Sequence, residues 1–187
     1  MTALLGNNNK PEGDDGSGMW KSFLTYFFGS PFLCPACGRP VEQAPLLCPI
    51  CLRDFPFNRN PQSDPLYLGE SEEPLLTWVQ RAAHQEDYRL AEALGHLLGM
   101  FAAGRGSCRR REVVVYAPQR RTSFDFHRAL AEEVARCLGL PVFSIIEGTA
   151  HLMERRVLYV DVWSEAGFLP PVPGLRLSLV GPSRSKV

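Results

Sequence analysis

The sequence has no net charge, because 20 lysines and arginines balance 20 aspartates and glutamates. Such a chain has no global field that draws it to nucleic acid or to an anionic membrane, so polyanion binding must come from local patches. The sequence also lacks a run of the ~18 apolar residues that a membrane span requires. Its most apolar stretch near the start, residues 20–33, is interrupted by Lys21, Gly29, Ser30 and Pro31. We expect an amphipathic helix there and no membrane span.

The N-terminus lacks the basic-then-apolar order and the small-residue cleavage site of a secretory signal. Residues 7–18 are polar and rich in glycine, which predicts a disordered leader over residues 1–18. The four histidines share no motif, so they indicate no catalytic site. Four of the six cysteines form C-x-x-C pairs. Without a secretion signal, this pattern favours a metal site in a cytoplasmic protein over a disulfide framework.

The two pairs are Cys34-Pro-Ala-Cys37 and Cys48-Pro-Ile-Cys51, with ten residues between them. Two such knuckles can close a tetrahedral four-thiolate shell around Zn2+, and a closed shell leaves no position for a catalytic water. The sequence therefore predicts a structural zinc site, in a module over residues 19–65 that also contains the amphipathic helix. The alternatives are reduced cysteines without metal, two disulfides or an iron–sulfur cluster.

Residues 66–187 alternate between helical and strand patterns, which predicts an α/β domain with a parallel sheet and right-handed crossovers. Ligand sites in such sheets lie beyond the carboxyl ends of the strands. We expect helices over residues 74–83, 87–103 and 123–138, strands over 113–116, 142–146, 157–162 and 175–180, and strand-end loops at 117–124, 147–151 and 162–167.

Arginines stand on both sides of the predicted strand 113–116. This local excess of positive charge is a candidate nucleic-acid-binding site, with Tyr116 and Phe124 available for base stacking. The alternative is a solvated loop. The candidate residues are Arg109, Arg110, Arg111, Arg120 and Arg121.

The order of parts resembles the ComF family of competence proteins over about residues 19–180. The best-matched stretches are Phe-Leu-Cys-Pro-Ala-Cys-Gly at residues 32–38, Leu-Cys-Pro-Ile-Cys at 47–51, and residues 113–138. The resemblance implies a zinc module joined to a type I phosphoribosyltransferase-like parallel sheet with flanking helices. It also implies a role in DNA uptake during natural transformation, with a ComFA-like competence helicase and single-stranded DNA as partners.

The sequence departs from this family where substrate would bind. Enzymes of this fold carry a strand that ends in two adjacent carboxylates, followed by a small loop, and these hold phosphoribosyl pyrophosphate and Mg2+. Here one acid, Asp161, is followed by Val162 and Trp163, and Glu165 opposes a phosphate. The residues of this residual phosphoribosyl-binding site are Asp161, Ser164, Glu165, Ala166 and Gly167, and Mg2+ is expected only if phosphoribosyl pyrophosphate binds. Alternatively, Asp161 caps the following turn.

Three hypotheses follow from the sequence. The first is a degenerate ComF-like protein that binds single-stranded DNA or a helicase without catalysis, and for which we name no catalytic residue. The second is a working phosphoribosyltransferase that uses Asp161 on the ribose and residues 164–167 on the phosphate. The third is a zinc-stabilised adaptor between proteins.

Overall fold

A computed structural model describes residues 32–42, 46–60, 66–118, 124–145, 152, 154–163 and 174–181. These residues belong to one compact unit, Phe32–Val187. The expected leader and aromatic helix lie outside the described residues. Among the helices that the structure describes, none is long and apolar enough to cross a bilayer.

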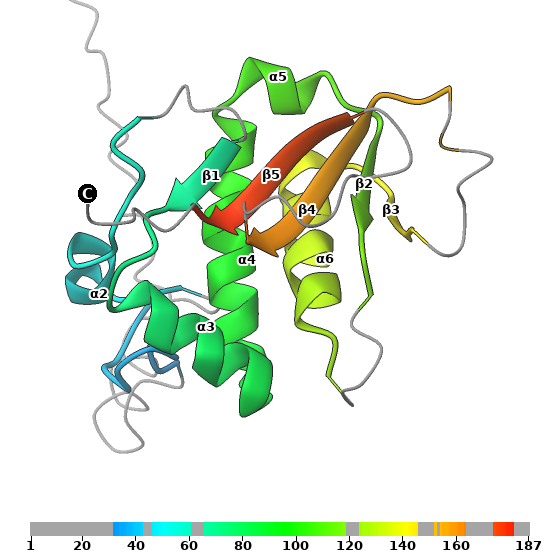
Figure 1. The fold of residues 1–187 in the computed structure, drawn as a ribbon. Helices are drawn as coiled ribbons and strands as arrows, with labels where there is room; N and C mark the ends of the chain where they lie inside the picture. Colours follow the sequence, from blue (N-terminus) through cyan, green and yellow to red (C-terminus); the bar gives the residue numbers. More distant parts are fainter. Residues whose placement is uncertain are drawn as a thin grey trace, which may run out of the picture. The chain divides into compact units, whose positions relative to one another are not determined.

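The α/β fold class is confirmed, because five parallel strands form one sheet in the order β1-β5-β4-β2-β3 (Figure 1). The strands are β1 Leu66–Gly69, β2 Val113–Tyr116, β3 Val142–Ser144, β4 Val157–Trp163 and β5 Gly174–Val180. The described helices are α2 Pro49–Arg53, α3 Leu75–His84, α4 Tyr88–Ala103, α5 Gly106–Arg109 and α6 Phe126–Leu138.

Capping side chains set where the two longest of the described helices begin. The Asp87 carboxylate accepts the Leu90 N–H at 3.1 Å at the start of α4, and Asp125 accepts the Arg128 N–H at 3.1 Å at the start of α6. Helix α6 therefore begins three residues later than the predicted position 123, because Asp125 satisfies its first free N–H groups. It ends at Gly139, whose φ of 68° is the left-handed C-cap conformation that glycine adopts readily.

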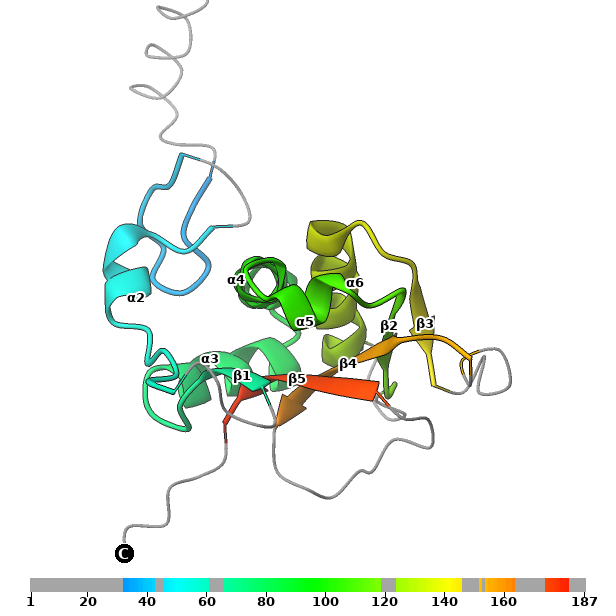
Figure 2. The ribbon, with the colours of Figure 1, turned by 90° about the horizontal axis from the view of Figure 1, so that it is seen from above.

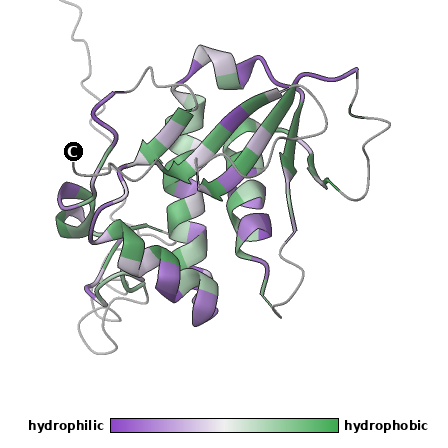
Figure 3. Cartoon of the chain, viewed as in Figure 1, coloured by the Kyte–Doolittle hydropathy of each residue, from purple (hydrophilic) through white to green (hydrophobic). Residues whose placement is uncertain are grey.

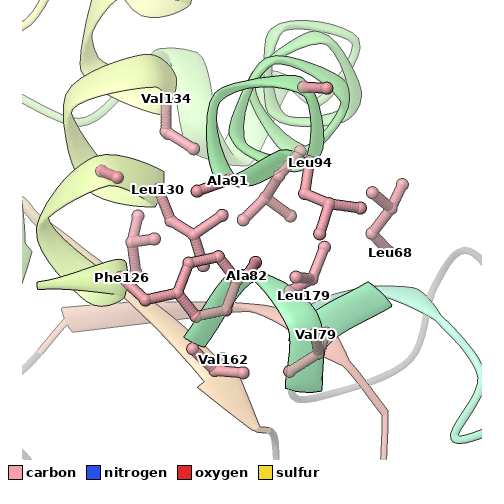
Figure 4. Packing of buried hydrophobic residues seen from close by; sticks show 14 of the residues in the cluster. Leu68, Val79, Ala82, Ala91, Leu94, Phe126, Leu130, Val134, Val162 and Leu179 are labelled. Carbon is pink, nitrogen blue, oxygen red and sulfur yellow. The ribbon is translucent and has the colours of Figure 1, made fainter. Parts of the chain in front are cut away.

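Helices α4 and α6 lie side by side over one face of the sheet (Figure 2). Figure 4 shows Leu94 of α4 and Leu130 and Phe126 of α6 in the same apolar layer as Leu179 of β5. The two helices approach closely, since a Cβ on Gly95 would lie 2.8 Å from the Glu133 Cβ. This apolar layer supplies most of the driving force for folding the domain.

The strands β2 and β4 are buried on both faces. Alternate residues of each strand point to opposite sides of the sheet. Val113 and Val115 of β2 and Val157 and Tyr159 of β4 form a second cluster with Leu152, separate from the core under the helices. Burial on both faces explains why these central parallel strands read as continuous apolar runs in the sequence.

The proline and asparagine content of residues 55–65 predicts a linker or a hairpin arm, and the described residues 55–60 form a hairpin arm against β1. Asn58 donates its N–H to the Leu68 carbonyl at 2.8 Å, and Glu70 donates its N–H to the Pro56 carbonyl at 2.7 Å. Phe57 forms an antiparallel bridge with Gly69. The segment therefore pairs with the outer edge of β1, a strand that the sequence did not predict, and covers an edge that would otherwise expose unpaired backbone groups.

Candidate metal centre and strand-end site

The sulfurs of Cys34, Cys37, Cys48 and Cys51 form a cluster in which every pair lies within 4.8 Å. The Cys37 and Cys48 sulfurs are 3.6 Å apart. Four thiolates at ~2.3 Å from one tetrahedral zinc ion would lie ~3.8 Å from each other, so this donor set fits a single four-coordinate ion. The four cysteines are arranged to bind a metal ion, and three of the four side chains are buried.

Local backbone geometry forms each knuckle. Gly38 takes a φ of 74° and donates its N–H to the Cys34 carbonyl at 2.7 Å, which turns the chain back after the first pair. A side chain would strain this left-handed conformation, so glycine suits the position. Cys48 is the N-cap of α2, and its own N–H points at the Cys34 sulfur at 3.3 Å. The second pair is thus placed by the first turn of a helix.

The thiols of the cluster differ in acidity. The pKa of Cys48 is lowered to about 7, chiefly because the backbone N–H of Cys51 donates a hydrogen bond to its sulfur. Burial acts in the opposite direction but is outweighed. Burial and the adjacent sulfurs raise the pKa of Cys51 well above its ordinary value. The four sulfurs cannot all ionise in this space unless a cation neutralises them, which is what a bound metal ion supplies.

Arg81 of α3 connects the first knuckle to the α/β domain. Its guanidinium donates to the Ala36 carbonyl at 3.0 Å and to the Pro35 carbonyl. The same group pairs with Asp87, the N-cap of α4, at 2.6 Å. One side chain thereby satisfies two knuckle carbonyls and one helix-capping carboxylate, so the position of the metal cluster depends on the α3–α4 junction.

A second candidate site lies where the strand order reverses. From β2 the chain passes through α6 to β3 on one side, and then returns to β4 on the other side of β2. The carboxyl ends of β2 and β4 therefore flank the topological switch point, the usual ligand position in an open α/β sheet. Tyr116 pairs in register with Val160, which brings the residue after Val160, Asp161, to this edge.

At this edge, Asp161 is engaged by the protein itself. One carboxylate oxygen lies 2.7 Å from an Arg176 nitrogen, and the other lies 3.5 Å from His127 Nε2 and accepts the Val162 N–H at 2.7 Å. Burial raises the pKa of Asp161, but hydrogen bonds and charge from His127 and Arg176 outweigh it, so its pKa lies below the ordinary value. The contact with Val162 lies within β4, and the turn that Asp161 was alternatively expected to cap lies outside the described residues.

The neighbours of Asp161 in β4 give no second acid. Val160 and Val162 are buried in the core under the helices, and Trp163 is 41% exposed. Two adjacent carboxylates would be needed to hold ribose hydroxyls and Mg2+ in the manner that the resemblance implies. Both oxygens of Asp161 already have partners, so the carboxylate is poorly suited to ligate a cation. Ser164, Glu165, Ala166 and Gly167 lie outside the described residues.

Three of the five candidate nucleic-acid residues lie at the opposite, amino end of β2. Arg109 ends α5, and Arg110 and Arg111 follow it directly before the strand. Arg120 and Arg121 lie outside the described residues. Tyr116 and Phe124 are 9% and 4% exposed, so their rings are covered and offer little of the stacking surface expected from the sequence.

Sequence reasoning missed three side chains of these sites: Arg81, His127 and Arg176. None belongs to a motif, and each acts on a residue distant in the chain, for example Arg81 on Ala36 across 45 positions. The only available signal was position, because His127 lies at the start of a helix that follows a strand end. Comparison with protein-family models, curated proteins and solved structures finds no match for this chain.

The ion pair of Asp161 with Arg176 and its contact with His127 predict a pH-dependent contribution to stability. We expect Asp161→Asn to lower the free energy of unfolding by about 2 kcal/mol at pH 7, because charged hydrogen bonds are lost. Since the folded pKa lies below the unfolded value of about 3.9, this contribution is complete above that value and disappears as the pH falls through the folded pKa. Urea unfolding of both proteins between pH 7 and pH 2.5 measures the difference.

Asp54→Asn is the matched control. Asp54 also pairs with an arginine, Arg53, at 3.0 Å, but both side chains are more than half exposed. We expect Asp54→Asn to lower the free energy of unfolding by less than about 0.5 kcal/mol. Equal losses of unfolding free energy for the two variants, or a gap between wild type and Asp161→Asn that does not narrow as the pH falls, would contradict the assigned role of Asp161.

Proposed function

We propose that this protein is a non-catalytic, ComF-like protein of DNA uptake that binds single-stranded DNA or a competence helicase. The order of parts supports the likeness, since a four-cysteine module precedes a parallel sheet with flanking helices. The observation that carries the non-catalytic assignment is the engagement of Asp161 by Arg176 and His127. The link to DNA uptake depends on the family resemblance.

The electrostatics of the strand end support the absence of phosphoribosyl transfer. An enzyme of this kind needs free carboxylate oxygens for the ribose hydroxyls and for Mg2+. Here an arginine neutralises the single carboxylate, and the guanidinium also donates to the Trp163 carbonyl at 2.7 Å. Releasing Asp161 for a substrate would leave Arg176, whose side chain is 17% exposed, without its anionic partner. Such a loss is costly for a largely buried charge.

We further propose that the metal ion is zinc and that its role is structural. Four thiolates in a closed tetrahedral shell are typical of structural zinc sites. The cysteines pack in one continuous apolar cluster with Phe55 of the following segment and Trp78 of α3. An ion in this place would stabilise a segment that buries too little apolar surface to fold alone.

Calorimetry with phosphoribosyl pyrophosphate and Mg2+ tests the non-catalytic assignment. We expect no saturable heat with the metal-loaded protein at millimolar ligand, because the site lacks paired carboxylates. Micromolar binding that Asp161→Ala abolishes would overturn the proposal in favour of an active phosphoribosyltransferase. The partner assignment is tested with single-stranded oligonucleotides and a purified competence helicase. Binding to neither would leave a zinc-stabilised protein adaptor.

A further inference from the structure

Positive charge is concentrated at the amino ends of β2 and β4, the edge opposite the switch-point site. The two segments that lead into these strands, residues 105–112 and 154–156, hold six arginines and only two glutamates. The whole chain is neutral, so the rest of the sequence carries an equal excess of negative charge. Figure 3 shows the hydrophilic (purple) chain at the start of both strands. We call these two segments the basic edge.

Strand pairing brings the two segments together. Val113 pairs in register with Val157, so the residues before them are neighbours. Glu112 donates its N–H to the Arg156 carbonyl at 2.9 Å, and the Arg156 side chain returns to the Glu112 carboxylate at 2.9 Å. One of the two glutamates is thus already neutralised. Arg111 and Arg155, one position further out on each segment, extend the basic edge beyond this pair.

Two arginines of the basic edge are held in place by helix ends. Arg109 Nε donates to the Ala103 carbonyl at the end of α4, and Arg111 Nε donates to the Ser107 carbonyl in α5 at 3.1 Å. Each contact uses the Nε atom, while a guanidinium has five N–H donors. Fixing these side chains lowers the entropy lost when a ligand binds. The remaining N–H groups of each fixed guanidinium can donate to two oxygens of one phosphate group.

Arg110 and Arg155 are exposed, and the described part of the chain shows no ion pair for either. Exposed arginines usually occur interspersed with acids, whereas a patch of one sign attracts polyanions. Acidic side chains lie instead beyond the opposite, carboxyl ends of the strands, for example Glu72, Glu73 and Asp125. The basic edge therefore attracts a polyanion.

The aromatic content of the basic edge favours a single strand over a duplex or a membrane surface. Arg105 lies 4.5 Å above the Phe101 ring, which is only partly buried at the end of α4. Cationic grooves combined with accessible aromatic rings and arginine planes bind unpaired bases as well as phosphates. A duplex keeps its bases stacked inside, so it would use only the charges.

We propose that the basic edge is the single-stranded nucleic-acid interface of this protein, with Arg109, Arg110, Arg111 and Arg155 contacting phosphates and Phe101 with Arg105 offering a surface for bases. This inference rests on the proposed function and gives that function a location. It places the nucleic acid away from the switch-point site, and it adds Arg155 and Arg156, which the sequence pattern did not include.

The experiment compares binding of labelled thirty-nucleotide oligothymidylate by fluorescence anisotropy between 50 and 200 mM salt. Wild type is compared with Arg110→Gln/Arg155→Gln and with the control Arg53→Gln/Arg89→Gln, which removes two exposed arginines from α2 and from the start of α4. Helix α4 spans ~24 Å, so the control position in α4 lies far from the basic edge. We expect the first double variant to bind at least tenfold more weakly, with a salt slope smaller by about 1.4, and the control to match wild type.

The outcomes separate the two claims. Wild type could bind the oligonucleotide with a clear salt dependence while both double variants lose equally little affinity. The basic edge would then not be the interface, whereas the proposed function would stand. If wild type does not bind the oligonucleotide, the DNA arm of the proposed function fails together with this inference. Binding to phosphatidylserine vesicles but not to the oligonucleotide would assign the basic edge to a membrane surface and overturn the inference.

Discussion

Replacing Cys48 with serine is expected to empty the metal centre. We expect about one zinc ion per wild-type chain and almost none in Cys48→Ser, because a serine hydroxyl does not supply the lost thiolate. Apparent binding free energies of structural zinc are about 10–16 kcal/mol, as large as the whole stability of a typical domain. Elemental analysis of the purified proteins gives the zinc content. Hydrogen exchange at the N–H groups of Cys34 and Gly38, both bonded within the first knuckle, gives the structural effect.

Cys137→Ser is the matched control for this prediction. Cys137 lies on α6 outside the cluster, so the variant should keep its zinc and its protection of the first knuckle. Cys48→Ser that retained one zinc ion per chain would contradict the four-thiolate assignment. So would wild-type protein whose four cluster cysteines form disulfides under reducing conditions.

Residue spacing alone predicted the metal centre, because all four ligands lie within two short motifs. A C-x-x-C turn positions its sulfurs through local backbone geometry, which a sequence records directly. The helices α4 and α6 were predictable for the same reason, since apolar periodicity and the caps Gly104 and Gly139 are local signals. The parallel sheet followed from the alternation of these helices with apolar strands.

Strand β1 and helix α5 were missed because nothing local marks them. β1 has four residues, Leu66–Gly69, and becomes a strand by pairing with β5, more than a hundred positions later in the chain. Its small Gly69 is explained only by the fold, since a Cβ there would lie 2.5 Å from a Leu75 methyl group. Short elements with non-local partners depend on tertiary context more than on propensity.

The sequence predicted the acid of the strand-end site but not the side chains that contact it. The lone acid Asp161 and its missing neighbour could be read from the strand motif, but its partners could not. His127 reaches it from the start of α6, and Arg176 reaches it from β5, so only the assembled sheet brings the three together. The difference matters for function, because a free carboxylate is available to a ligand, whereas this one is already held by His127 and Arg176.

Replacing Arg81 with methionine is expected to loosen the metal-binding module from the α/β domain. Methionine keeps most of the apolar stem and removes donors to the Pro35 and Ala36 carbonyls and the ion pair with Asp87. Hydrogen bonds to charged groups contribute about 1.5–3 kcal/mol each when buried, and the Arg81 side chain is 30% exposed. We therefore expect the free energy of unfolding to fall by about 2–4 kcal/mol. We also expect faster loss of metal to a chelator, because the first knuckle is no longer held.

The comparison that isolates this role is Arg53→Met, which removes an arginine that is 74% exposed and paired with Asp54. It should cost less than about 0.5 kcal/mol and leave the rate of metal loss unchanged. The stability and the rate of metal loss of Arg81→Lys should lie between those of wild type and Arg81→Met. A lysine ammonium keeps the charge but lacks the planar guanidinium that donates to both carbonyls and to Asp87 at once. If Arg81→Met released metal at the wild-type rate, the two knuckle carbonyls would not need their donor. The metal ion alone would then hold the module in place.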